Sequence, residues 1–221
     1  SALPARSEMC IRDRDFTVHV DPFELAPDTA YYYRFHCLGE ISPVGATRTV
    51  RSQVAQNSGV SASGAGDERL RFAVTSCANY ESGFFGAYGD IARRAEAGEL
   101  DMVIHMGDYI YEYATGEAPG KHGVVRPHVP TWTLTSLADY RSRYGNYRRD
   151  VELQAAHAAL PWVVTWDDHE IANDAYAHGA EEHNVHVHGP WKRRQSAGMQ
   201  AYFEWLPIRA TNPSQGGHLY R

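Results

Sequence analysis

The sequence predicts an α/β fold built on a parallel sheet and preceded by a smaller group of β-strands. Three short apolar runs alternate with two segments of helical periodicity, in the order 71–76, 86–99, 101–106, 136–160 and 161–166. Strand, helix, strand, helix, strand in this order is typical of parallel strands joined by right-handed crossovers. The first quarter of the chain instead has short alternating runs separated by Pro, Gly and Asp, which predict antiparallel strands.

Three segments near the N-terminus predict the later part of a β-sandwich. "DFTVHVDPF" (15–23) alternates like a strand, and "LAPDTAYYYRFHCLG" (25–39) places a Pro-Asp turn before an aromatic strand. "GATRTVRS" (45–52) predicts a closing edge strand. These strands are too few for a complete sandwich.

A Gly/Ser/Ala-rich stretch, "QNSGVSASGAGDE" (56–68), separates the two parts and predicts a linker. We therefore expect a β part over 1–55, a linker over 56–69 and an α/β part over 70–221.

The helical segments of the α/β part also contain boundary signals. The segment 136–160 is expected to break near Gly145, with Asp150 as the N-cap of its second piece. A final helix is expected near 192–207.

Composition excludes some classes of protein. The 221 residues are 43% hydrophobic and 22% charged, which is ordinary for a globular chain. A formal charge of −6 without a basic block argues against nucleic acid as a partner. No apolar run approaches the ~18 residues of a transmembrane helix. The chain opens on Ser1 without a signal peptide, so we expect a processed or trimmed product.

Three cysteines do not make a disulfide framework. A bridge between Cys10 and Cys37 would leave Cys77 over. Cys77 directly follows the first strand of the predicted parallel sheet, so it is a candidate functional residue.

Polar side chains follow each of the three strands of the predicted parallel sheet. Parallel strands present their carboxyl ends at one edge, and ligands of open sheets bind there. The three strands would therefore deliver thiol, carboxylate, phenol, imidazole and amide groups to one site. These residues are Cys77 after the first strand, Asp108, Tyr109 and Tyr111 after the second, and Asp167, Asp168, His169, Glu170, Asn173 and Asp174 after the third.

The stretch "HMGDYIYEY" (105–113) indicates a metal site. Gly107 allows a sharp turn and the close approach of another group, and Asp108 is then placed to be shared between two cations. Tyr111 can turn back toward the same point. A phenol, with an ordinary pKa of about 10, ionises near neutral pH only beside a strong Lewis acid such as Fe³⁺. The Cys77 thiol has the same requirement.

Each of these residues also has a structural interpretation. A cysteine after a strand is often a small core residue, and Gly-Asp is often a turn or a helix cap. Tyrosines near the edge of a sheet often pack with their hydroxyl groups in water. The metal-site hypothesis depends on all three sets falling at strand ends of one βαβαβ unit.

Two further segments contain basic or histidine side chains. The loop 113–135 is long enough to be a substrate lid, in which Lys121 or Arg126 would contact a phosphate, or else a solvated loop with incidental charges. The histidine-rich run 178–188 predicts flexible surface histidines rather than a metal site.

The motifs "SCANYESGFFGAY", "DMVIHMGDYIYEY" and "WVVTWDDHEIANDAY", with "AYFEWLPIR" and "HLYR", resemble the PhoD-like alkaline phosphatases and phosphodiesterases. This family is part of the calcineurin-like metallophosphoesterase superfamily. The resemblance covers most of 70–221, and residues 10–53 resemble the end of the family's immunoglobulin-like N-terminal domain. It implies a four-layer α/β sandwich with metals at the strand ends, of which this chain would hold the first half.

The resemblance also implies a ligand set. Cys77, Asp108 and Tyr111 would bind Fe³⁺, and Asp108 would bridge to Ca²⁺. Asp168 and Asn173 would be ligands on the calcium side. His169 would contact phosphate or act as general acid. The ligand types alone are also compatible with copper or zinc.

Other expectations about the site come from the residues themselves or from the family's extent. Asp167 or Glu170 would orient His169. The family continues past "LYR", where further ligands including histidines are expected, so the chain is expected to be partial.

The implied function is metal-dependent hydrolysis of phosphate monoesters and diesters by an exported enzyme, either secreted, periplasmic or bound to the cell envelope. Two alternatives stay open. One is a phospholipase D of the same family, which would act on a membrane lipid or an envelope substrate. The other is a non-catalytic envelope binding protein on a degenerate phosphatase scaffold.

Overall fold

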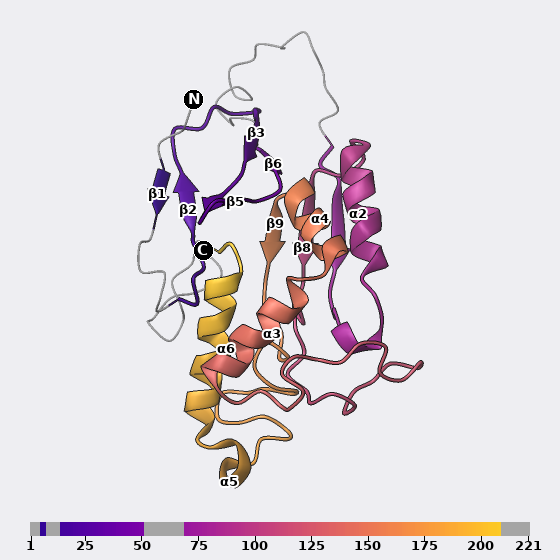
Figure 1. The fold of residues 1–221 in the computed structure, drawn as a ribbon, viewed down its shortest axis with the longest axis vertical. Coiled ribbons are helices and arrows are strands. Elements are labelled where there is room, and N and C mark those ends of the chain that lie inside the picture. The colour runs from indigo at the N-terminus through magenta and orange to yellow at the C-terminus, as the bar shows by residue number, and fades with distance from the viewer. Residues whose placement is uncertain (1–4, 8–13, 51–68, 209–221) are drawn as a thin grey trace.

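The computed structural model describes residues 5–7, 14–50 and 69–208 (Figure 1). Its central element is a parallel sheet of three strands in the order β7-β8-β9. The strands are β7 (Phe72–Thr75), β8 (Met102–His105) and β9 (Trp162–Val164). All three predicted strands and their parallel pairing are confirmed.

Only one face of this sheet is covered in the described chain. Along β8, Val103 and His105 are fully buried, whereas Met102 and Ile104, which alternate with them, are partly exposed. The register aligns Val74, Ile104 and Val163 on the second face, where Val74 and Val163 are 58% and 53% exposed. An exposed row of apolar side chains on a sheet face is typical of a sheet that packs against another layer. The remaining layers of the predicted four-layer sandwich stay a prediction.

Four helices build the core with the covered face. Helix α2 (Gly86–Glu96) packs on α4 (Val151–Ala159), and α3 (Leu137–Tyr147) packs on α6 (Trp191–Trp205). One core cluster joins them to β8 through the buried side chains Tyr88, Val103, Tyr144, Leu153 and Tyr202. The four predicted helical pieces are therefore confirmed, with shifts of a few residues at their ends.

The break between α3 and α4 lies later than the sequence predicts. Helix α3 continues through Gly145 to Tyr147, and the chain turns only before Asp150. Asp150 is the N-cap of α4, as predicted, and accepts hydrogen bonds from the backbone N–H groups of Glu152 and Leu153, both at 3.0 Å. The cap decides the boundary because it satisfies N–H groups that the first turn of a helix leaves unpaired.

The loop 113–135 is fastened to the core by a buried arginine. The Arg143 guanidinium is completely buried, and it donates hydrogen bonds to backbone carbonyls at both ends of the loop region. Those acceptors are Tyr111, Tyr113, Val129, Pro130 and Trp132. Burial lowers the pKa of Arg143 to about 10. The loop is therefore neither wholly solvated nor free at its ends.

Arg126 does not serve as the predicted phosphate contact. Its guanidinium pairs with Asp150 at 2.5 Å, with little exposure of either side chain, and lies 3.6 Å above the ring centre of Tyr80. These contacts make it a structural residue of the loop. Lys121 is exposed.

The described residues of the N-terminal part form three antiparallel strand pairs. They are β1 (Ala5–Ser7) with β2 (Val20–Pro22), β3 (Ala30–Tyr33) with β6 (Gly45–Arg48), and β4 (His36–Cys37) with β5 (Glu40–Ile41). The antiparallel character is confirmed, although the strand predicted at 15–23 is short. The pairs do not establish an immunoglobulin-like sandwich, and this domain and the predicted domain boundaries stay predictions. Residues 56–68 and Cys10 lie outside the described residues.

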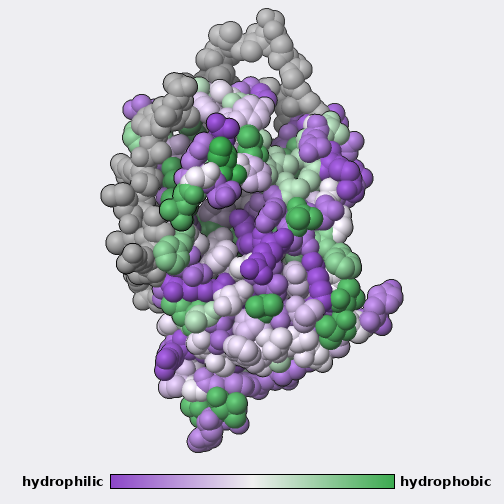
Figure 2. Space-filling view, in the orientation of Figure 1, coloured by the Kyte–Doolittle hydropathy of each residue, from purple (hydrophilic) through white to green (hydrophobic). Residues whose placement is uncertain are grey.

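The histidine-rich run includes a short exposed helix, α5 (Val185–His188). Its histidines are therefore not arranged along an extended strand. Figure 2 shows hydrophilic and hydrophobic residues interspersed over the visible face. Within the described ranges, no helix combines the length and hydropathy that a membrane span requires.

Buried histidines make the fold sensitive to acid. Burial lowers the pKa of His105 to about 4 and that of His128 to about 3. Because these values lie below the ordinary 6.5, the unfolded chain takes up protons first as the pH falls. The contribution of these two neutral histidines to the free energy of unfolding is fully present above about pH 6.5. Below that pH we expect the free energy of unfolding to fall by about 1.4 kcal/mol per pH unit for each histidine.

We predict that His128→Leu removes the contribution of one histidine, about 1.4 kcal/mol per pH unit, from the pH dependence of the free energy of unfolding. Urea unfolding at pH 7.5, 6 and 5 measures this change. Neither ring nitrogen of His128 has a hydrogen-bond partner within the described residues, so the variant loses no such bond and should be at least as stable at pH 7.5. An unchanged slope between pH 6 and 5 would contradict the prediction.

Candidate metal centre

The chain leaves all three parallel strands at one edge of the sheet and stays paired beyond it. The Cys77 N–H donates to the Gly107 carbonyl at 3.2 Å, and the Ala78 N–H donates to the Asp108 carbonyl at 2.9 Å. Cys77 and Asp108 have left-handed backbones, with φ of +58° and +55°. Such conformations cost non-glycine residues about 1–3 kcal/mol and cluster at functional sites.

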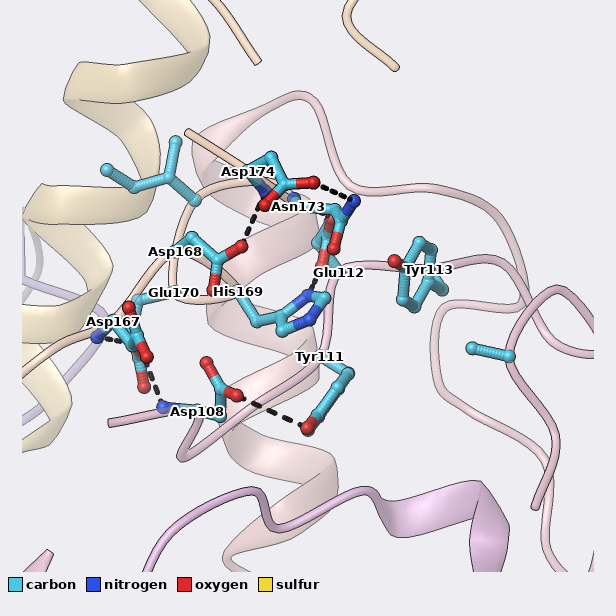
Figure 3. Close-up of polar contacts among 12 residues, drawn as sticks. Asp108, Tyr111, Glu112, Tyr113, Asp167, Asp168, His169, Glu170, Asn173 and Asp174 are labelled. Carbon is cyan, nitrogen blue, oxygen red and sulfur yellow. Dashed lines mark hydrogen bonds and ion pairs between the residues drawn. The ribbon is translucent and has the colours of Figure 1, made fainter. Parts of the chain in front are cut away.

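Asp108 is the point on which the side chains converge (Figure 3). Its Oδ2 accepts hydrogen bonds from the Cys77 thiol at 3.4 Å and from the Tyr111 hydroxyl at 3.3 Å. Its Oδ1 is buried and has no hydrogen-bond partner among the described residues. The predicted return of Tyr111 to Asp108 is confirmed, and Cys77 is exposed rather than a core residue.

Asp168 and His169 complete the cluster. One possible ligand atom from each of Asp108, Asp168 and His169 lies within 4.8 Å of the others. Burial raises the pKa of Asp108, and the charges of Asp168 and Asp167 add to this effect. Burial likewise raises the pKa of Tyr111, with further increases from Asp108 and Cys77.

The cluster of Asp108, Asp168 and His169 has the features expected of a cation site. Closely placed carboxylates repel one another, and no described residue donates a hydrogen bond to the buried Asp108 Oδ1. A cation would satisfy that oxygen and oppose the increase in the pKa of Asp108, which burial and the neighbouring acidic charges cause. The donor set of carboxylate, imidazole, thiol and phenol groups consists of known metal-ligand types. The residues therefore fit a metal ion.

His169 is oriented by Glu112. Its Nδ1 lies 2.8 Å from Glu112 Oε2, and its ring stacks on Tyr111 with 4.2 Å between ring centres. Burial lowers the pKa of His169, but the hydrogen bond and charge of Glu112, with the charges of Asp108 and Asp168, outweigh burial and raise it. The other oxygen of Glu112 accepts from the Asn173 N–H at 2.6 Å. Glu112 thus joins the second and third motifs.

The orienting role that the sequence assigned to Asp167 or Glu170 is therefore corrected. The Asp167 side chain is exposed beside Gly107, and its catalytic role stays a prediction. Glu170 is buried and accepts backbone hydrogen bonds from Asp108 at 3.1 Å, Tyr109 at 2.5 Å and Asp167 at 2.7 Å. Burial raises the pKa of Glu170 to about 8, against the lowering effect of these three bonds.

Asn173 lies beside the cluster, but its amide nitrogen points to other acids. This nitrogen donates to Asp174 Oδ2 at 3.2 Å and to Glu181 Oε2 at 3.0 Å. The Asp174 N–H donates to Asp168 Oδ2 at 2.5 Å, which holds that carboxylate in place. Asn173 as a metal ligand stays a prediction.

Sequence reasoning missed Glu112. It is nearly completely buried within the tyrosine-rich stretch. A glutamate in an otherwise aromatic stretch was the available signal, because carboxylates are rarely buried unless they are paired. The partner, His169, is 57 residues away and only the fold identifies it.

Comparisons with known proteins agree with this architecture. A family model described as PhoD-like phosphatase matches residues 72–221, and one described as PhoD-like phosphatase, N-terminal domain, matches residues 3–51. Alkaline phosphatase D of Bacillus subtilis (strain 168) is 42% identical over 217 residues, which cover 97% of this chain and 34% of that protein.

A solved structure described as "Structure of PhoD" has a TM-score of 0.73 and 40% sequence identity. The match covers 91% of this chain and 35% of that one. The chain thus spans about a third of the length of both relatives.

Gly107 provides a test of the local geometry. Its φ is +104°, and a Cβ atom there would lie 2.6 Å from the backbone nitrogen of Asp167. We predict that Gly107→Ala lowers the free energy of unfolding by more than the ~1 kcal/mol expected for alanine at a left-handed position. Urea unfolding would measure this loss. The matched control is Gly98→Ala, because Gly98 also has positive φ but faces open space. Equal losses would show that the approach of Asp167 is unimportant.

A second prediction concerns Glu112. Glu112→Gln removes the charge that raises the pKa of His169, so this pKa should fall. An NMR titration of the imidazole protons in the metal-free chain measures it. Glu99→Gln, on the exposed surface after α2, is the control and should leave the pKa of His169 as it is. A pKa that does not move in Glu112→Gln would remove Glu112 from the site.

Proposed function

This chain belongs to the PhoD-like phosphatase family, and we propose that it acts in the metal-dependent hydrolysis of phosphate monoesters and diesters. The observation that supports this most directly is the convergence of three strand ends on Asp108. Cys77 and Tyr111 both donate hydrogen bonds to its carboxylate. Asp168 and His169 lie close enough to Asp108, within 4.8 Å between possible ligand atoms, to bind the same ion.

The proposed metals are Fe³⁺ and Ca²⁺. Cys77, Asp108 and Tyr111 would hold the iron, since sulfur and phenol ligands suit a trivalent ion. Asp108, Asp168 and Asn173 would hold the calcium through oxygen atoms, which this hard cation prefers. When bound, the cations would supply Lewis-acid chemistry that polarises the phosphoryl oxygens and offsets the charge of the transition state.

The side chains of this chain have distinct tasks in that reaction. Cys77 and Tyr111 must lose the protons that they now donate to Asp108, so metal affinity is expected to increase with pH. Glu112 holds Nδ1 of His169, which leaves Nε2 to protonate the leaving oxygen as the P–O ester bond breaks. Such general acid catalysis typically contributes about 10²–10⁴ in rate. Water supplies the oxygen that phosphorus gains.

The leaving group is proposed only as an alcohol of a phosphate ester. A lipid headgroup, as in a phospholipase D, uses the same chemistry and is distinguished by assay. A non-catalytic binding protein explains the observations less well, because such a protein does not require five potential metal ligands, Asp108 among them, to be gathered at one place. Export to the cell envelope is proposed from family membership.

We predict that Asp108→Asn abolishes turnover of an aryl phosphate and weakens binding of both metals by more than about 100-fold, beyond the range for outer-sphere partners. Elemental analysis and a phosphatase assay on the metal-loaded chain measure these effects. Asp101→Asn, at the opposite end of β8, is the matched control. Full metal content with near-normal turnover in Asp108→Asn would refute the assignment.

The same preparation tests Tyr111 as an iron ligand. A ferric phenolate is coloured, so the loaded chain should have a visible absorption band that Tyr111→Phe removes. Tyr113→Phe, two residues away, should retain the band. A colourless but active chain would exclude both Tyr111 as a ligand and ferric iron.

A further inference from the structure

We infer that Glu170 is a positioning residue that fixes the separation of the two acidic loops at the sheet edge, and that helix α6 holds Glu170 in place through Gly198. The inference rests on the proposed metal centre, since it concerns how Asp108 and Asp168 are held at ligand-sharing distance. Glu170 itself is not assigned a contact with metal or substrate.

Glu170 ties one loop to the other with a single carboxylate. Figure 3 shows its side chain between Asp167 and the backbone of Asp108. Its Oε2 accepts from the Asp108 N–H at 3.1 Å and from the Asp167 N–H at 2.7 Å, and its Oε1 accepts from the Tyr109 N–H at 2.5 Å. The first and third of these N–H groups belong to the loop after β8, and the second belongs to the loop after β9.

This arrangement has a consequence for the cluster. Each tied loop contributes one of the two carboxylates that repel each other, Asp108 and Asp168. Backbone N–H groups of both loops donate to this one buried side chain, so moving the loops apart would leave buried donors or acceptors without partners, and Glu170 opposes that separation. Glu170 is 1% exposed and both its oxygens already accept hydrogen bonds, which makes it a support rather than a ligand.

Helix α6 presses on the same backbone. A Cβ atom at Gly198 would lie 2.7 Å from the Glu170 carbonyl oxygen and 3.3 Å from Ile171 Cα. Apart from proline, glycine is the least favourable residue in a helix interior, so this close approach is the physical reason for a glycine in the middle of α6. Because both contacts are with backbone atoms, no side-chain rotation can relieve them.

A second contact secures the next peptide unit. The Tyr140 hydroxyl of α3 donates to the Ile171 carbonyl at 2.5 Å, and Arg194 Nε of α6 donates to the Tyr140 oxygen at 3.4 Å. All these groups are buried. The peptide units that directly follow His169 are thus held by contacts with α3 and α6. These helices are distant in the sequence, yet their contacts help to determine the geometry of the site.

Two variants test the two ends of this support by calorimetric titration of the metal-free chain with Ca²⁺ and, separately, with Fe³⁺ as its citrate chelate. Glu170→Gln keeps the size of the side chain but turns an NH₂ group toward backbone donors. We expect its affinity for at least one cation to fall about 10–100-fold, the range for supporting residues of metal ligands. Gly198→Ala should also lower the affinity for at least one cation, because its Cβ would displace the backbone of Glu170.

Matched controls separate positioning from general loss of stability. Gly145→Ala is also a substitution within a helix, but its Cβ would make an ordinary contact 3.5 Å from Trp205, so affinity should not change. Ile91→Val weakens the core on α2, away from the edge, and should lower the unfolding midpoint without lowering affinity. Circular dichroism at the titration temperature verifies that every variant is folded.

The outcomes distinguish this inference from the proposed function. Normal affinity for both cations in Glu170→Gln, with the parent chain binding them, would overturn the positioning role and leave the metal centre intact. An equal loss in Ile91→Val would also overturn it, since affinity would then follow stability. A parent chain that binds neither cation would overturn both proposals.

Discussion

The repulsion between carboxylates gathered at one sheet edge is the constraint on which the rest of the site depends. Asp108 and Asp168 reach the same point because parallel strands end at the same edge. Left-handed backbone at Cys77 and Asp108, and the close passage of Asp167 over Gly107, are further costs of bringing these groups together. The folded chain meets those costs through its buried helices and through hydrogen bonds from thiol, phenol and backbone groups. Folding therefore brings these carboxylates together despite their mutual repulsion, as expected of a centre that would bind cations.

Different surroundings give the nearby acids different roles. Glu112 faces the imidazole of His169, orients that ring and raises its pKa. Glu170 faces backbone N–H groups and serves geometry. Asp108 faces a thiol and a phenol, and one of its oxygens is buried without a donor among the described residues, which is the feature that fits the cation we propose. Residue type does not distinguish these carboxylates, whereas their hydrogen-bond partners do.

The scaffold shows a similar division. One face of the parallel sheet meets an aromatic core in which His105 contacts Tyr88 and Trp162, and Val103 and His105 are fully buried there. The other face presents aligned apolar side chains to solvent in the described residues. In a chain that spans about a third of its relatives' length, an uncovered apolar sheet face is consistent with the layered sandwich that the family resemblance implies.

Local patterns determined much of this protein from the sequence alone. The strand and helix order, the polar strand ends, the Asp150 cap and the return of Tyr111 to Asp108 all involve residues close in sequence or the fixed geometry of parallel strands. Tertiary structure alone decided the pairing of Glu112 with His169, the bonds of Glu170 across the two loops, the close approach of Gly198 and the burial of Arg126. The physical reason is that periodicity fixes which side of an element a residue occupies, whereas a buried charge or a crowded glycine is explained only by a partner tens of residues away.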